Sequence, residues 1–207
     1  MNTDEIIQYV KGHPSGKVKI ALTDIDGVLR GKYISTEKFL SVIDSNTGFC
    51  DVIFGWDSND VAYDNVEFTG WHTGYPDAPV RIDVATFRKI PWENDVPFFL
   101  GEMIDTNGGP SPVCPRQLLK KVLNDADHLG YLPYFSQEFE WYNFAETPQS
   151  ISDKQFNNLA PLTAGMFGYS ILRSSLQNPY FTDLFDLLKK FNIPLEGLHT
   201  ETGPGTY

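Results

Sequence analysis

The sequence predicts an α+β fold with two domains, a small β-grasp-like domain over residues 1–105 and a second domain over residues 113–207. The first hundred residues contain several short apolar runs with the spacing of strands and only a few helical patterns. Residues 106–112, TNGGPSP, have the glycine and proline content of an interdomain linker. The second half then contains two long helical patterns, which are separated by polar and acidic segments.

The first domain is expected to begin with a helix over residues 2–12, which Asn2 or Thr3 would cap at its start. Apolar residues then predict a strand over residues 17–23. A turn with the sequence D-I-D-G follows, and it leads into a second strand that ends near Ile34. The beginning of the domain is therefore predicted as a helix followed by a hairpin.

A short helix is predicted over residues 36–43, and the next segment, residues 45–80, is rich in glycine, aspartate, asparagine and aromatic residues. This composition predicts a long structured loop, and loops of this length inside compact domains are usually functional or disordered. Its aromatic residues argue against disorder. Three more strands are predicted at the end of the domain, over residues 79–84, 86–90 and 96–105.

The second domain is expected to open with a helix over residues 115–129, because Pro115 favours the first helical position and Gly130 follows the last. Apolar side chains recur on one face of this helix, and we expect that face to be buried: Leu118, Leu119, Val122, Ala126 and Leu129. A further helix is predicted to begin at Asn178 and to continue to Phe191.

Composition excludes several classes of function. The formal net charge of −11 argues against a nucleic-acid partner, which would require clustered Lys and Arg. No apolar run approaches the length of a membrane span, so no membrane association is expected. Cys50 and Cys114 lie far apart without a CxxC spacing, so neither a disulfide framework nor a zinc site is predicted. The N-terminus lacks the layout of a signal peptide, and we expect a cytoplasmic protein.

Two segments of the second domain carry closely spaced acidic side chains. Glu138 and Glu140 are two positions apart in QEFEW, as are His199 and Glu201 in EGLHTETGPG. On a β-strand, side chains at this spacing point to the same face. Mg²⁺ and Mn²⁺ prefer such oxygen ligands and often hold substrate phosphates beside them. Two strands of this kind predict a divalent-cation site; the alternative is a pair of solvated edge strands with ordinary acidic residues.

Together, QEFEW and EGLHTETGPG resemble the glutamine synthetase superfamily, which includes the γ-glutamyl-polyamine and γ-glutamyl-methylamide ligases. In that family a G-x-E-x-E strand precedes E-x-x-H-x-E, a glycine-rich turn and one more glutamate. The resemblance implies that the second domain is the first part of a catalytic α/β domain with a mainly antiparallel sheet. The last glutamate of the pattern would fall after Tyr207, so the resemblance predicts the front part of a longer enzyme, truncated inside its catalytic domain.

By this resemblance, Glu138, Glu140 and Glu201 would be metal ligands, and Glu196 and His199 would lie on the ATP side. The intact enzyme would use ATP and two or three Mg²⁺ or Mn²⁺ ions per site to join the γ-carboxylate of glutamate to ammonia or an amine, through a γ-glutamyl phosphate. It would be a homo-oligomer with active sites shared between subunits. Because further ligands would lie beyond the present sequence, the 207-residue chain alone is expected to be inactive.

The segment G-W-D-S at residues 55–58 resembles the loop of the family's N-terminal domain that reaches a neighbouring subunit's active site. Asp57 would then help to bind or deprotonate the incoming ammonium or amine. Ser58 stands where the family usually has glycine, and an aspartate that only closes an Asx-turn is the alternative interpretation.

Two other functions stay open. The segment D-I-D-G-V-L matches the first motif of haloacid-dehalogenase-type phosphatases, with Asp24 as nucleophile and Asp26 as general acid–base around Mg²⁺. The run of βα units that such an enzyme needs does not follow, and the resemblance favours a hairpin turn in which Gly27 permits the geometry and Arg30 and Lys32 are structural or interfacial. A non-catalytic structural relative of glutamine synthetase is the other alternative.

Overall fold

The computed structural model describes the whole sequence, Met1–Tyr207, and the chain divides into two compact units. The first unit is Met1–Pro133 and the second is Tyr134–Tyr207. The boundary between the units therefore lies later than the predicted linker at residues 106–112, because helix α3 (Pro115–His128) belongs to the first unit by its contacts.

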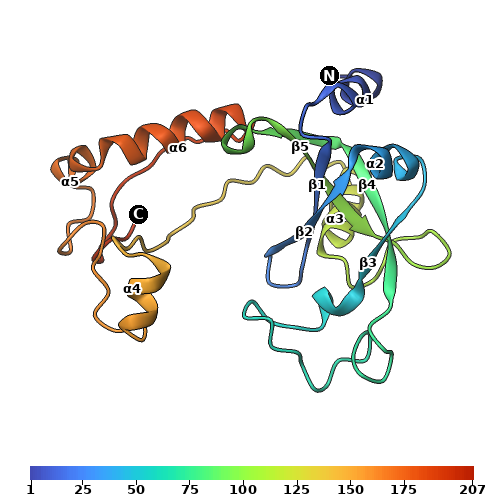
Figure 1. The fold of residues 1–207 in the computed structure, drawn as a ribbon, viewed down its shortest axis with the longest axis horizontal. Coiled ribbons are helices and arrows are strands. Elements are labelled where there is room, and N and C mark those ends of the chain that lie inside the picture. The colour runs from blue at the N-terminus through green and yellow to red at the C-terminus, as the bar shows by residue number, and fades with distance from the viewer. The chain divides into compact units, whose positions relative to one another are not determined.

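A five-stranded mixed sheet forms the centre of the first unit (Figure 1), with the strand order β2-β1-β5-β4-β3. The strands are β1 (Lys17–Thr23), β2 (Leu29–Ser35), β3 (Thr47–Cys50), β4 (Asp77–Ile90) and β5 (Val96–Met103). β1 and β5 pair in parallel, and the other three pairings are antiparallel. The predicted α+β class is confirmed. The sequence pattern missed β3 and divided β4 in two, at the place where its pairing with β5 is irregular, between Asp83 and Arg88.

Helices α1 (Thr3–Gly12) and α2 (Thr36–Val42) pack on one face of this sheet. The predicted start of α1 is confirmed, because Asn2 and Glu5 each accept a hydrogen bond from the other's backbone N–H. Phe39 of α2 stacks on Phe99 of β5 with 4.8 Å between the ring centroids. The buried core between helices and sheet consists of Ile6, Val10, Val18, Ile20, Phe39, Val42, Ile82 and Phe99.

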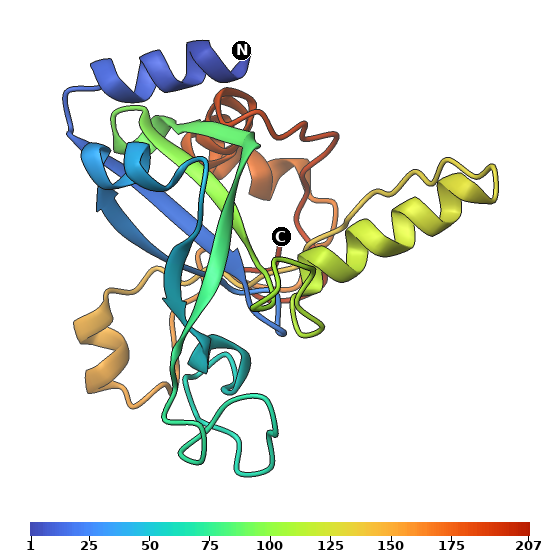
Figure 2. The same ribbon diagram turned by 90° about the vertical axis from the view of Figure 1, so that its right-hand side faces the viewer.

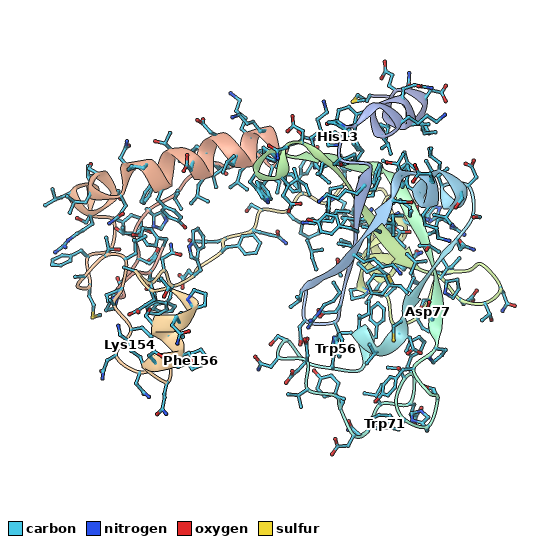
Figure 3. All side chains as sticks on the ribbon, in the orientation of Figure 1. His13, Trp56, Trp71, Asp77, Lys154 and Phe156 are labelled. Carbon is cyan, nitrogen blue, oxygen red and sulfur yellow. The ribbon has the colours of Figure 1, made fainter.

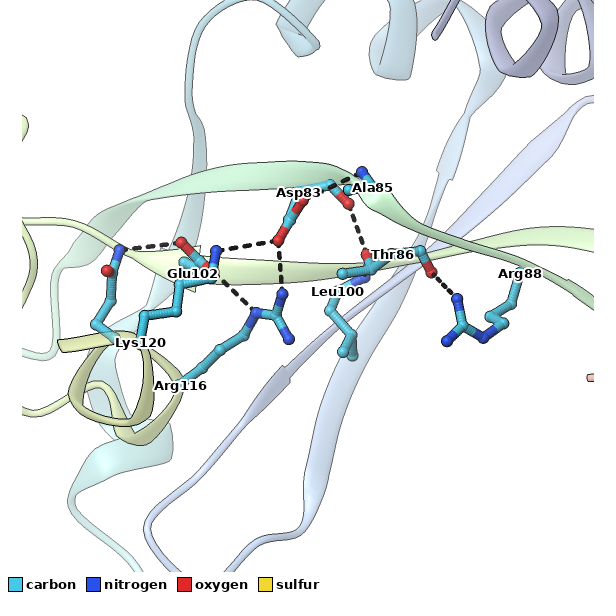
Figure 4. Close-up of polar contacts among 9 residues, drawn as sticks. Asp83, Ala85, Thr86, Arg88, Leu100, Glu102, Arg116 and Lys120 are labelled. Atoms are coloured by element: carbon cyan, nitrogen blue, oxygen red, sulfur yellow. Dashed lines mark hydrogen bonds and ion pairs between the residues drawn. The ribbon is translucent and has the colours of Figure 1, made fainter. Parts of the chain in front are cut away.

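Helix α3 is attached to the sheet by a cluster of ion pairs (Figure 4). Arg116 donates to Glu102 at 2.8 Å and also to Asp83, and Lys120 reaches the same two carboxylates. Burial alone would raise the pKa of Asp83, but the hydrogen bonds and charges of Arg116 and Lys120 outweigh it and hold that pKa below its ordinary value. These interactions explain why α3 belongs to the first unit.

The expected burial of the apolar face of α3 is wrong. Leu118, Val122 and Leu129 are 60%, 53% and 74% exposed, and no residue of the helix is buried. Figure 2 shows α3 running away from the sheet. An amphipathic pattern predicts a helix from local spacing, but burial needs a second apolar surface, and the first unit does not provide one for this face.

The turn between β1 and β2 is built around Asp24, which is fully buried. One carboxylate oxygen accepts the backbone N–H groups of Asp26 and Val28 at 3.0 and 2.9 Å, and the other accepts Arg30 Nε at 2.7 Å. Gly27 takes φ +82°, as the turn requires. Both oxygens of Asp24 are therefore committed to the hairpin, as the turn interpretation predicts, and neither is left as a free nucleophile.

The long segment after β3 is structured, as predicted. It begins with the 3₁₀ helix η1 (Asp51–Phe54), where Thr69 donates its hydroxyl to the buried carboxylate of Asp51. Farther along, Trp71 (Figure 3) is 89% exposed and makes an edge-on ring contact with Tyr75. A second 3₁₀ turn, η2 (Pro91–Glu93), joins β4 to β5.

The second unit contains three helices, α4 (Pro148–Asp153), α5 (Ile171–Leu176) and α6 (Asn178–Lys190), and α6 confirms the helix predicted there. The strands predicted around Glu138 and His199 are not formed. Only isolated bridges occur, between Tyr142 and Thr206 and between Phe144 and Pro161. A strand needs a hydrogen-bonded neighbour along its length, and here the backbone pairing is confined to a few residues beyond Glu140.

Glu146 organises the loop around α4. Its side chain accepts the backbone N–H of Ala160 at 2.6 Å and also interacts with Lys154 and Ser150. Chiefly because of the Ala160 N–H, and then of Lys154 and Ser150, the pKa of Glu146 falls from 4.5 to about 2.

A pH titration should show this shift. Since the pKa of Glu146 is lowered in the folded state, the stabilisation it provides is present above pH 4.5 and is lost as the pH falls through about 2. We expect the amide proton of Ala160 to titrate with a midpoint near pH 2 in NMR spectra, and Glu146→Gln to abolish that titration. A midpoint near 4.5 would contradict the hydrogen-bonded geometry.

Candidate divalent-cation site

Three potential metal ligands lie together in the second unit. Glu138, His199 and Glu201 each offer a ligand atom, and these atoms all lie within 4.8 Å of one another. His199 Nδ1 is 3.3 Å from a carboxylate oxygen of Glu201. Glu138 is exposed, whereas His199 and Glu201 are half-buried. The structure thus brings side chains from both acidic segments to one place, although neither segment is a strand.

A tight turn shapes the end of the chain. The N–H of Glu201 donates to the carbonyl of Thr206 at 2.9 Å. Gly205 has φ +75°, and an added Cβ would lie 2.4 Å from the carbonyl oxygen of Asn143, so this position requires glycine. Trp141 and Tyr207 exchange backbone hydrogen bonds at 3.1 Å in both directions. This short pairing joins the residues that follow Glu140 to the turn that follows Glu201.

An aromatic cluster fixes that pairing. Tyr207 is 2% exposed, and its hydroxyl is 2.7 Å from Thr163 Oγ1. Its ring packs against Trp141, Tyr180 and Phe181, and Trp141 Nε1 donates to the Tyr180 hydroxyl at 3.0 Å. Because Tyr180 and Phe181 belong to α6, the two acidic segments are held against a helix rather than against a sheet.

The two segments line a cleft of about 420 Å³. All five side chains that the resemblance assigned to metal or ATP line it: Glu138, Glu140, Glu196, His199 and Glu201. Glu140 and Glu196 lie outside the group of three ligand atoms. The cleft therefore gathers the predicted residues, and a subset of them is close enough to share one ion.

The chemistry of this donor set fits a divalent cation. Two carboxylates lie close together, and neither Glu138 nor Glu201 forms an ion pair with a lysine or arginine. Like charges at such separation repel each other, and a bound cation removes that repulsion. Carboxylate oxygens suit Mg²⁺ and Mn²⁺, and transition metals also accept an imidazole nitrogen.

Asp57, the candidate catalytic residue of the first unit, closes a turn. One of its carboxylate oxygens accepts the backbone N–H groups of Asn59 and Val61 at 2.8 and 3.0 Å. This is the Asx-turn geometry of the alternative interpretation. The second carboxylate oxygen accepts no hydrogen bond, so it is available to a ligand.

Sequence reasoning missed two residues next to His199, Thr200 and Tyr169, which do not line the cleft themselves. Thr200 is 3% exposed, and its hydroxyl donates to the Phe167 carbonyl at 2.9 Å and accepts the Ser170 N–H at 3.0 Å. Tyr169 stacks on the ring of His199. The only sequence signal for Thr200 was its position between two predicted site residues, His199 and Glu201.

The fold and the cleft define an α+β protein with a carboxylate-rich candidate cation site, and relatives are known for it. Residues 112–207 match the family described as "Glutamine synthetase, catalytic domain". The chain belongs to the glutamine synthetase family. None of its helices is long and apolar enough to span a membrane.

Individual relatives extend the likeness over the whole chain. The protein is 56% identical over 208 residues to "Type-1 glutamine synthetase 2" of Dictyostelium discoideum, covering 100% of this chain and 40% of the relative. It is 33% identical over 205 residues to "Glutamate--isopropylamine ligase" of a Pseudomonas species, covering 98% of this chain and 44% of the relative. The solved structure "GmaS/ADP complex-Conformation 1" shares the fold, with a TM-score of 0.67 at 15% identity over 97% of this chain and 42% of its own. The present chain thus spans less than half the length of these relatives.

Proposed function

We propose that this chain forms part of an ATP-dependent ligase that joins the γ-carboxylate of glutamate to ammonia or an amine through a γ-glutamyl phosphate. The observation that carries the proposal is the grouping of Glu138, His199 and Glu201 on one cleft. These residues stand in the two segments that resemble the metal- and ATP-binding pattern of the family. The similarity to a relative named as an isopropylamine ligase supports an amine as well as ammonia as acceptor.

The chemistry explains why carboxylates are gathered here. A carboxylate is a poor electrophile, so the γ-carboxylate of glutamate must be phosphorylated before an amine can attack it. When bound, Mg²⁺ or Mn²⁺ ions neutralise charge on the phosphates and on the substrate carboxylate. Glu138, Glu140 and Glu201 hold the ions and so fix the position of both substrates, which is the main contribution of a protein to phosphoryl transfer.

His199 and Glu196 are proposed to serve the ATP side of the cleft. The imidazole of His199 lies beside Glu201, at 3.3 Å, and within the group of potential metal ligands. Divalent cations often bind protein carboxylates and nucleotide phosphates together. A residue in the group of cation ligands would therefore also lie near the phosphates of a bound nucleotide. His199 can thus serve both as a metal ligand and as a residue on the ATP side.

The remaining parts of the proposal rest on the family likeness. The first unit acts as a β-grasp-like N-terminal domain, and the intact protein is a cytoplasmic homo-oligomer with shared active sites. Asp57 uses its free carboxylate oxygen to bind or deprotonate the amine in a neighbouring subunit's site. Its neighbouring Arg30 supports this loop, since Arg30 donates to the carbonyl of Asp57 at 3.1 Å.

A chimera tests the proposed function. This chain would replace the 208 aligned residues of the Dictyostelium relative, and γ-glutamyl hydroxamate would be measured with glutamate, ATP, hydroxylamine and Mg²⁺. We expect the chimera to form the product and Glu138→Gln to lower the rate by at least about 100-fold. The 207-residue chain alone should form none.

The unaltered relative and an exposed Glu67→Gln chimera serve as controls. A folded chimera that forms no product, while the relative is active, would indicate a non-catalytic family member. Full activity of the Glu138→Gln chimera would show that the cleft is not the catalytic site.

A further inference from the structure

Tyr169 has an unusual backbone conformation beside the cleft. Its φ is +57°, in the left-handed region, and its side chain is 71% exposed. Residues other than glycine avoid this region, because Cβ crowds the carbonyl oxygen. An exposed ring also recovers little from the hydrophobic effect. Strained residues of this kind persist where the surrounding structure holds them, and they often mark functional positions.

Thr200 holds Tyr169 in place. The N–H of Tyr169 donates to the Thr200 carbonyl at 2.7 Å, and the next N–H, from Ser170, donates to the Thr200 hydroxyl at 3.0 Å. The same hydroxyl donates to the carbonyl of Phe167. Since Thr200 lies between His199 and Glu201, the strained segment is attached directly to the two residues of the cation group.

The consequence of this attachment is a ring stack. The rings of Tyr169 and His199 lie 4.4 Å apart between centroids, with 20° between their planes. The imidazole of His199 also contacts Glu201, whose carboxylate oxygen is 3.3 Å from Nδ1. The hydroxyl of Tyr169 makes no hydrogen bond, so its contact with the site is through the ring alone.

We propose that Tyr169 is a positioning residue that holds the imidazole of His199 toward Glu138 and Glu201 by stacking on it. The inference rests on the proposed function, because the cation is what the positioned imidazole would serve. The left-handed backbone at Tyr169 accompanies a stacked contact between its ring and the imidazole of His199. The ligand that His199 would bind together with the carboxylates of Glu138 and Glu201 is a divalent cation.

Two substitutions separate this role from a merely structural one. Tyr169→Gly removes the ring and relieves the φ strain, so it should fold at least as stably as the natural chain. Tyr169→Phe keeps the ring and removes only the unbonded hydroxyl. Both are made in the 207-residue chain and compared by thermal unfolding, by Mn²⁺ titration with electron paramagnetic resonance, and by NMR of the histidine rings, with His199→Gln for assignment.

We expect Tyr169→Gly to keep its stability, to lose the ring-current shift of the His199 protons, and to bind Mn²⁺ about 2- to 10-fold more weakly, the range for an aromatic pair. Tyr169→Phe should match the natural chain in all three measurements. Equal Mn²⁺ affinity in the natural chain and Tyr169→Gly, or an unchanged His199 shift, would overturn the positioning role only. Absence of Mn²⁺ binding in the natural chain would overturn the shared cation site and the positioning role with it, whereas the chimera assay tests the proposed function separately.

Discussion

Asp24→Ala is expected to lower the free energy of unfolding of the first unit by about 1–3 kcal/mol, the range for leaving hydrogen-bonding groups without their buried partner. Asp24 is fully buried, and its two oxygens accept the hydrogen bonds of Val28 and Asp26 N–H and of Arg30. Alanine leaves these part-buried donors without the acceptor that the buried carboxylate supplied. Urea unfolding followed by circular dichroism measures the change.

Asp26→Ala is the matched control, because Asp26 lies in the same turn and is exposed. It should unfold close to the natural chain. Equal stability of Asp24→Ala and the natural chain would mean that the hairpin does not depend on the buried carboxylate. That result would favour the alternative hypothesis that Asp24 is a phosphatase nucleophile, because a nucleophile needs a free carboxylate oxygen.

The parts of the fold that local signals specify were predictable. Alternating Val18, Ile20 and Leu22 indicated β1, and the cap at Asn2 indicated α1. β3 was missed because it is only four residues long, contains Gly48, and exists through its pairing with the distant strand β4. Local sequence does not specify such a partner.

The predictions of a buried α3 face and of strands in the second unit were wrong for a related reason. A helical period identifies an apolar face, but the surface that covers it is a property of the tertiary structure. Glu138 and Glu140 have the spacing of a strand, yet no backbone ladder forms along them. The spacing of residues indicates which side chains would share one face of a strand. It does not indicate which segment, if any, would form hydrogen bonds with that strand.

At the candidate site, the sequence predicted which acidic residues are involved. It did not predict which of them lie close enough to share one cation. The spacing of His199 and Glu201 indicated a common face, and both belong to the group of ligand atoms. Glu140 has the same spacing from Glu138 but lies outside that group, because the segment is not a regular strand. Tyr169 gave no signal, since its role depends on a positive φ and on Thr200, 31 positions later in the sequence.

Glu201→Gln is expected to weaken Mn²⁺ binding by at least about 100-fold, beyond the 10- to 100-fold effect typical of residues that only orient a ligand. The substitution removes one of the two negative charges in the group and leaves the shape of the side chain unchanged. Glu138→Gln should have a comparable effect. Glu67→Gln, an exposed glutamate of the first unit, should bind Mn²⁺ as the natural chain does.

The most direct measurement is an Mn²⁺ titration of the natural chain, followed by electron paramagnetic resonance, with these three variants in parallel. We predict a bound ion in the natural chain and in Glu67→Gln, and loss of that ion in both Glu138→Gln and Glu201→Gln. Binding that survives in both cleft variants, or no binding in the natural chain, would contradict the claim that the two acidic segments share one cation.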